Sequence, residues 1–155
     1  MIDETGGHAA FVAAWFERAA RGLPAERLLD LLELACAALW ARVCPTLGEV
    51  TLAAIAERVF HDAAERFPVL ASIEVGLTGV RFEGPRAQGG ELRADEVASA
   101  ARSVLADFLT VLGHLTAEAL TPALHATLAG VTLGAAAPGA GRGPGRDRGK
   151  RRAKP

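Results

Sequence analysis

The sequence is short of the residues from which most active sites and metal centres are built. Its 155 residues include no tyrosine, one methionine, two cysteines and four histidines. Cys36 and Cys44 form no C-x-x-C pair, and no histidine lies at zinc spacing from either cysteine. The H-E-x-x-H and G-x-S-x-G patterns are also missing. We therefore expect no cofactor, no bound metal and no catalytic residues, and we interpret the protein as a non-enzyme.

The two cysteines and the hydropathy pattern indicate a cytoplasmic protein. Cys36 and Cys44 fall on one predicted helix, where eight residues separate their Cα atoms by about 12 Å, too far for a disulfide. Two reduced thiols are typical of the cytosol. No apolar run reaches the roughly 18 residues of a membrane-spanning helix, and the acidic start at Asp3 and Glu4 is unlike a signal peptide. The preference for arginine over lysine suggests a bacterial source.

The charges divide the chain into an acidic body and a basic tail. Residues 1–133 carry ten basic and seventeen acidic residues, whereas residues 134–155 carry seven basic residues and one acidic residue. The tail is otherwise mostly Gly, Pro and Ala, so it has nothing to bury and is predicted to be disordered. It is a candidate for non-specific binding of nucleic acid phosphates, with docking on an acidic protein surface, or no specific role, as alternatives. Its basic residues are Arg142, Arg146, Arg148, Lys150, Arg151, Arg152 and Lys154.

Apolar residues at three- and four-residue spacing predict a mainly α-helical domain over residues 1–133. The longest such pattern predicts a helix over residues 97–120, with a break at Thr121-Pro122 before a last helix that ends at Gly130 or Gly134. Three earlier helices are predicted over residues 8–21, 24–43 and 46–67. The third of these would begin with a capping box from Thr46 to Glu49.

Between the third and fourth predicted helices the period changes from about 3.6 to two. Folding residues 71–83 around Gly76–Gly79 places Val75 opposite Val80, Glu74 opposite Arg81, and Ile73 opposite Phe82. One face of this β-hairpin is then apolar and the other carries an opposite-charge pair. The expected fold is a five-helix orthogonal or bundle-like domain with one inserted hairpin and a disordered C-terminal tail.

The second predicted helix is apolar on every side over residues 34–41. A helix of this kind is buried on more than one side. It is either the central helix of the domain or a helix that meets a second subunit. In the second case the candidate oligomer face comprises Leu34, Ala38, Leu39 and Trp40.

The polar side of the long predicted helix is a candidate pocket or partner face. Asp107, Thr110, His114 and Glu118 share this side at helical spacing, and His125 would join them if the helix stayed nearly straight beyond Pro122. The plain interpretation is a solvated helix face.

Three functions remain open from the sequence. The first is a non-enzymatic regulatory or scaffolding module that acts through protein contacts and forms a homodimer. The second is a nucleic-acid-associated protein that binds phosphates through its tail. The third is a sensor that binds a small ligand between the long helix and the hairpin. The run from Leu105 to Leu128 resembles the helices of bacterial signalling domains, which fits the first of these.

Overall fold

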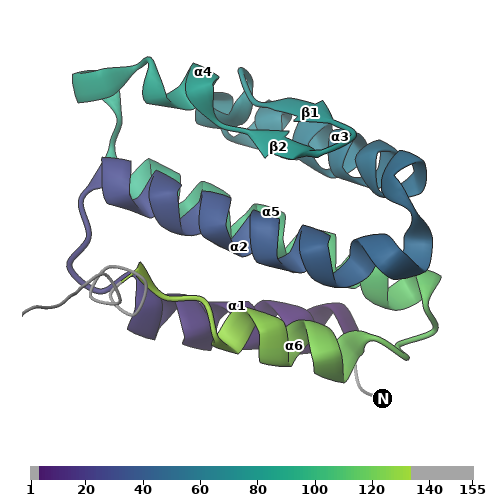
Figure 1. Ribbon diagram of the computed structural model, residues 1–155. Coiled ribbons are helices and arrows are strands. Elements are labelled where there is room, and N and C mark those ends of the chain that lie inside the picture. The colour runs from purple at the N-terminus through teal and green to yellow at the C-terminus, as the bar shows by residue number, and fades with distance from the viewer. Residues whose placement is uncertain (1–3, 134–155) are drawn as a thin grey trace, which may run out of the picture.

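A computed structural model describes residues 4–133 of the chain, so the predicted basic tail lies outside the described residues. The elements form three layers (Figure 1): α3, α4 and the hairpin on one side, α2 and α5 in the middle, and α1 and α6 on the other side. The helices are α1 (Glu4–Ala19), α2 (Ala25–Leu47), α3 (Glu49–Arg66), α4 (Glu83–Arg86), α5 (Ala94–Leu115) and α6 (Thr121–Ala129). The strands are β1 (Glu74–Gly76) and β2 (Gly79–Arg81), and two short 3-10 turns are η1 (Pro68–Leu70) and η2 (Gly89–Glu91).

This architecture confirms the predicted fold class, a mainly helical domain with a hairpin between the third and fourth helices. The sixth helix, α4, is a single turn within the segment that the sequence predicted as a loop. Gly84 in this turn explains part of the close packing there. A Cβ atom added at Gly84 would lie 2.5 Å from the Cβ atom of Ser72, so only glycine lets α4 approach the segment before β1.

The middle layer holds the core of the molecule. α5 packs against α1, α2 and α3, and α2 packs against α5, α6, α3 and β2. Leu31, Leu32, Ala35 and Leu39 of α2 have no exposed surface. α2 therefore lies between other elements of this chain, as expected for a central helix, while Leu34, Ala37 and Ala41 of its all-apolar stretch are exposed.

The junction between α2 and α3 differs from the predicted capping box. α2 continues through Pro45 to Leu47, so Thr46 lies inside it and cannot cap α3. Gly48 separates the two helices with a φ of 87°, and its N–H donates to the Cys44 carbonyl. The left-handed backbone that glycine allows reverses the chain without a side-chain cap.

The long helix ends earlier than predicted and the chain then folds back. α5 stops at Leu115, and Ala117 and Glu118 adopt φ values of 51° and 65°. The Glu118 N–H donates to the Gly113 carbonyl at 2.7 Å, which closes the turn. α6 consequently returns beside α1 rather than extending α5 (Figure 1). His125 therefore does not share the polar side of α5.

The hairpin has the predicted register, with shorter strands. Glu74 pairs with Arg81, Val75 with Val80, and Gly76 with Gly79. Its apolar side packs on the middle layer and α3, with β2 against α2 and β1 against α3. Phe82, which follows β2, is 2% exposed and meets Phe60 of α3 edge-on. Two helices thus supply the cover that an isolated hairpin needs.

Candidate functional site

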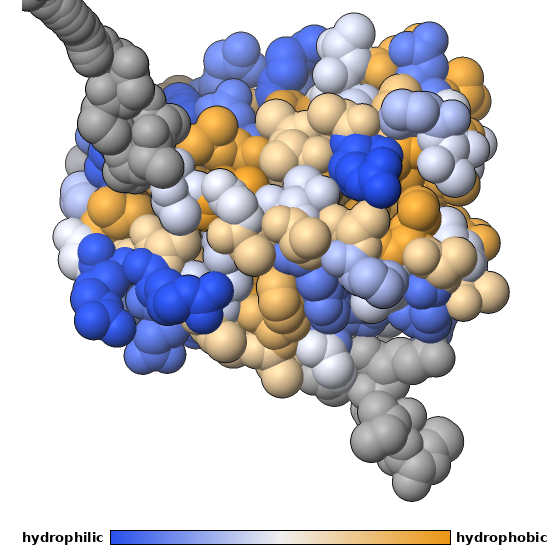
Figure 2. Space-filling model, turned by 60° about the horizontal axis from the view of Figure 1, so that its bottom comes forward, coloured by the Kyte–Doolittle hydropathy of each residue, from blue (hydrophilic) through white to orange (hydrophobic). Residues whose placement is uncertain are grey.

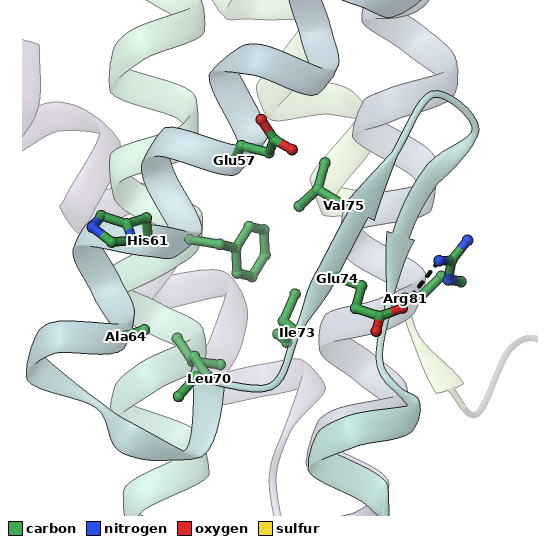
Figure 3. A pocket seen from close by; sticks show the side chains of 10 residues that line it. Glu57, His61, Ala64, Leu70, Ile73, Glu74, Val75 and Arg81 are labelled. Carbon is green, nitrogen blue, oxygen red and sulfur yellow. Dashed lines mark hydrogen bonds and ion pairs between the residues drawn. The ribbon is translucent and has the colours of Figure 1, made fainter.

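A pocket with a volume of about 570 Å³ lies between α3 and the hairpin (Figure 3). α3 forms one wall and β1 forms the other. The pocket falls within the size range of common binding sites, roughly 300–1,000 Å³. Its lining residues are Glu57, Phe60, His61, Ala64, Leu70, Ala71, Ile73, Glu74, Val75 and Arg81.

The floor of this pocket, which we call the α3–β1 groove, is apolar. Phe60 and Leu70 are buried there, while Ile73, Val75 and Ala64 remain half-buried. Figure 3 shows the side chains of Ile73 and Val75 on the α3 side of β1. These three half-buried residues expose a small apolar area that a bound group would remove from water, while most of the accessible surface lining the groove is polar.

The rim of the α3–β1 groove is charged and exposed. Arg81 is already paired, because its guanidinium donates to the Glu74 carboxylate at 3.0 Å. His61 lies 3.7 Å from the Glu65 carboxylate on the next turn of α3. The Glu57 side chain has no hydrogen bond or ion pair with any residue from 4 to 133. The rim therefore presents a carboxylate that no described cation neutralises.

The position of this groove differs from the ligand pocket expected between the long helix and the hairpin. None of the groove's lining residues comes from α5. The reason is the packing of the hairpin. It contacts α2 and α3, so these helices lie between the hairpin and α5. Periodicity could identify the hairpin but not the helix against which it would pack.

A second polar cluster joins α1 to the start of α6. His8 Nδ1 lies 3.1 Å from His125 Nε2, and His8 Nε2 lies 3.4 Å from Glu118 Oε1. The Thr121 hydroxyl donates to the same Glu118 oxygen. Phe11 stacks on the His125 ring, with centroids 4.0 Å apart. The cluster borders a cavity of about 170 Å³.

One assignment of protons satisfies both contacts of His8. If His125 Nε2–H donates to His8 Nδ1, then His8 Nε2–H is directed at the Glu118 carboxylate. Burial lowers the pKa of His125, the nearby His8 lowers it further, and Glu118 acts in the opposite direction. Within residues 4–133, no three His, Cys, Asp or Glu side chains are arranged to hold a metal ion. We interpret the cluster as a structural link between α1 and α6.

Only some of the residues predicted to form the polar face of the long helix lie together in the structure. Glu118 and His125 join one cluster, but through the turn after α5 and through contacts that each makes with His8. Asp107 instead pairs with Arg66 of α3 at 3.0 Å. The Thr110 hydroxyl donates to the Ala106 carbonyl of its own helix. His114 is exposed on the last turn of α5.

The predicted oligomer face is mostly inside the molecule. Leu39 has no exposed surface and Trp40 is 7% exposed, because β2 and the other helices cover them. Leu34, at 37%, and the half-buried Ala38 keep some exposed surface on α2. Only these two of the four residues are available for contact with a second chain.

Cys36 does not offer a reactive site. Both are free thiols, and Cys36 is buried in the core. Burial, with a smaller effect of Glu33, raises the pKa of Cys36 to about 12. A thiol with so high a pKa is a poor nucleophile, because the thiolate is the reactive form.

The layer of α1 and α6 borders two smaller pockets. One, of about 380 Å³, is lined by Phe16, Glu17 and Arg102 among others, and the second, of about 280 Å³, lies between α1 and the end of α6. Figure 2 shows weakly hydrophobic surface there, interrupted by charged groups. Exposed alanines of α1, including Ala9, Ala10 and Ala13, contribute to it. The exposed large apolar side chains of the described residues are Leu34, Val50, Leu77 and Leu115, all on other elements.

Two general findings complete the description of the chain. Over residues 4–133, every helix is too short or too polar to cross a lipid bilayer. Comparison with protein families, curated proteins and solved structures gave no match.

Proposed function

We propose that this domain is a non-enzymatic regulatory or scaffolding module that binds a segment of another protein in the α3–β1 groove. One observation carries the proposal: the groove combines an apolar floor with a charged, exposed rim. That combination is typical of peptide-recognition sites, where apolar side chains give affinity and rim charges give specificity. The side chains of Glu57, His61, Glu74 and Arg81 stand exposed along it, so the site is open along its length.

An open groove supports a protein segment better than a small ligand. Small molecules are usually held in concave sites that bury most of their surface. Here the rim residues are exposed, so a small molecule would keep much of its surface in water. An extended segment would instead continue beyond both ends of the groove.

Both features that suggested a homodimer are largely covered within one chain. Leu39 and Trp40 of α2 are buried, although Leu34, Ala37 and Ala41 are exposed, and the hairpin is covered by α2 and α3. We expect a mass near that of one chain, 16.1 kDa, in light scattering behind size exclusion. A stable mass of two chains would favour a second copy as the occupant of the groove.

Selection of peptides on two matched variants tests the proposal. A displayed random-peptide library is selected on the full chain, and the enriched peptides are measured against Ala64→Trp and Ala54→Trp. Ala64 lines the groove, whereas Ala54 is exposed on the same helix outside the groove lining. We expect Ala64→Trp to reduce the affinity at least tenfold and Ala54→Trp to leave it within twofold.

Two results would overturn the proposal: no sequence enriched on the full chain, or enriched peptides that bind Ala64→Trp as tightly as the unmodified protein. Far-UV circular dichroism and cooperative unfolding of both variants establish that the comparison is between folded proteins.

A further inference from the structure

The outer edge of β1 carries a backbone hydrogen-bonding pair that the fold does not use. Among the described residues β1 pairs only with β2, through Glu74–Arg81, Val75–Val80 and Gly76–Gly79. Leu77 and Thr78 form a two-residue loop, so the residues that flank it, Gly76 and Gly79, form a hydrogen-bonded pair. Hydrogen-bonded and non-hydrogen-bonded pairs alternate along an antiparallel ladder. Val75–Val80 is therefore a non-hydrogen-bonded pair, so the N–H and C=O of Val75 point away from β2. No turn or loop hydrogen bond of the described residues uses them.

This edge faces the α3–β1 groove. Figure 3 shows β1 between β2 and the groove, with α3 on the opposite side of the groove. Ile73 and Val75 line the groove from β1, and Phe60 and Ala64 line it from α3. A chain lying in the groove would have a strand edge on one side and a helix on the other, which is the setting in which peptides add to a sheet.

The charges of the rim and of the whole domain favour a basic segment. Glu57 is not neutralised by any described residue, and Arg81 is already engaged by Glu74. Glu65 adds a carboxylate one turn beyond the groove lining, beside His61. The domain as a whole, residues 1–133, has ten basic against seventeen acidic residues. Its field therefore attracts cationic partners and speeds their association.

We propose that the groove binds an extended, basic and apolar peptide segment that pairs with β1 as a third strand. This inference rests on the proposed function and specifies how the segment is recognised. The peptide exchanges an N–H and a C=O with Val75. Its side chains alternate between the two faces, so every second one packs on Phe60 and Ile73. Its lysine or arginine side chains reach the rim at Glu57, whose carboxylate has no cationic partner among the described residues.

Two proline variants test the pairing directly. Val75→Pro removes the N–H that faces the groove, while Val80→Pro removes the equivalent N–H on the outer edge of β2. Neither N–H belongs to the hydrogen-bonded ladder of the hairpin, so neither change removes a β1–β2 hydrogen bond. The probe is a capped heptapeptide of alternating arginine and valine, titrated into the full chain at physiological salt. We expect Val75→Pro to weaken binding at least tenfold and Val80→Pro to change it less than twofold.

The matched variants have the same charge, so non-specific attraction of the cationic probe affects both equally. A heptapeptide of alternating glutamate and valine should bind at least tenfold more weakly than the arginine probe. Amide hydrogen exchange gives a second readout in the unmodified protein: the arginine probe should slow exchange at Val75 and leave Val80 unchanged. This readout holds even if Val75→Pro fails to fold.

Equal binding by the two proline variants, or no protection of the Val75 amide, would overturn strand addition. Library-selected peptides that still depend on Ala64 would in that case leave the proposed function standing. If peptide binding did not depend on Ala64 either, both the strand addition and the proposed function would be overturned. A peptide of residues 138–155 of this chain that bound more tightly than the probe would identify the chain's own tail as the occupant, and would overturn the assignment to another protein.

Discussion

Among the described residues, His8 is a polar side chain that is buried in the domain. Its surroundings explain why this burial is tolerated. Burying an imidazole without hydrogen bonds would lower the free energy of unfolding by about 1–3 kcal/mol. Here each ring nitrogen meets a partner, His125 on one side and Glu118 on the other. Sequence reasoning found Glu118 and His125 but could not find His8, because a histidine near the N-terminus carries no periodic signal. Only the return of α6 alongside α1 brings the three residues together.

The lowered pKa of His125 gives the folded protein a defined dependence on pH. The unfolded chain has an ordinary histidine pKa of about 6.5, above that of the folded state. As the pH falls below about 6.5, the unfolded state takes up a proton that the folded state resists, so the free energy of unfolding decreases. We expect this decrease, followed by urea unfolding from about pH 7 to about pH 5, to be steeper in the unmodified protein than in His125→Phe.

Phenylalanine keeps an aromatic ring against Phe11 and removes the titrating group. The carboxylates titrate in both proteins, so the difference between the two curves reports the cluster. His61→Gln, which removes an exposed histidine of α3, is the matched control for the loss of an imidazole. Parallel curves for the unmodified protein and His125→Phe would refute this account.

At the scale of elements, α1 is attached to the end of α6 by one buried hydrogen bond. The Trp15 indole N–H donates to the Val131 carbonyl at 3.0 Å. Trp40 is also in the core, at 7% exposure, but its indole donates no hydrogen bond within residues 4–133. Replacing each by phenylalanine removes the same atoms. Trp15→Phe additionally leaves a buried carbonyl without its donor, so we expect it to lower the free energy of unfolding by about 1–2 kcal/mol more than Trp40→Phe.

Urea denaturation followed by circular dichroism measures both variants against the unmodified protein. If both variants lowered the free energy of unfolding equally, the hydrogen bond would contribute nothing beyond the packing of the ring.

The elements themselves were largely predictable from sequence, and their ends were less so. The hairpin register followed from alternation alone, because a shift of one residue would turn Val75 and Val80 to the solvent side. The end of α5 was not visible, since the left-handed residues there are Ala117 and Glu118 rather than glycine. Pro45 likewise suggested a helix end, yet α2 continues to Leu47. The α3–β1 groove was unpredictable for a different reason: it exists only through tertiary packing of two segments.

For the whole molecule, the separation of charge yields a prediction about polyanions. If the tail binds nucleic acid, affinity for a labelled oligothymidine should fall with salt, with a log–log slope between zero and about −5 for seven cations on a single strand. Replacing the seven tail arginines and lysines by glutamine should abolish binding, because the remaining domain is acidic. Fluorescence anisotropy measures both effects. Binding that survives the replacement would place the polyanion site on the helical domain instead.

The three layers also determine how the domain can be joined to other molecules. The first and last described residues, 4 and 133, both lie in the layer of α1 and α6, whereas α3 and β1, which line the groove, lie in the opposite layer (Figure 1). A fusion partner, an affinity tag or a surface linkage placed at either end would therefore leave the groove facing outward. The same geometry suits a domain carried within a larger assembly, because tethering it from behind keeps its recognition face open.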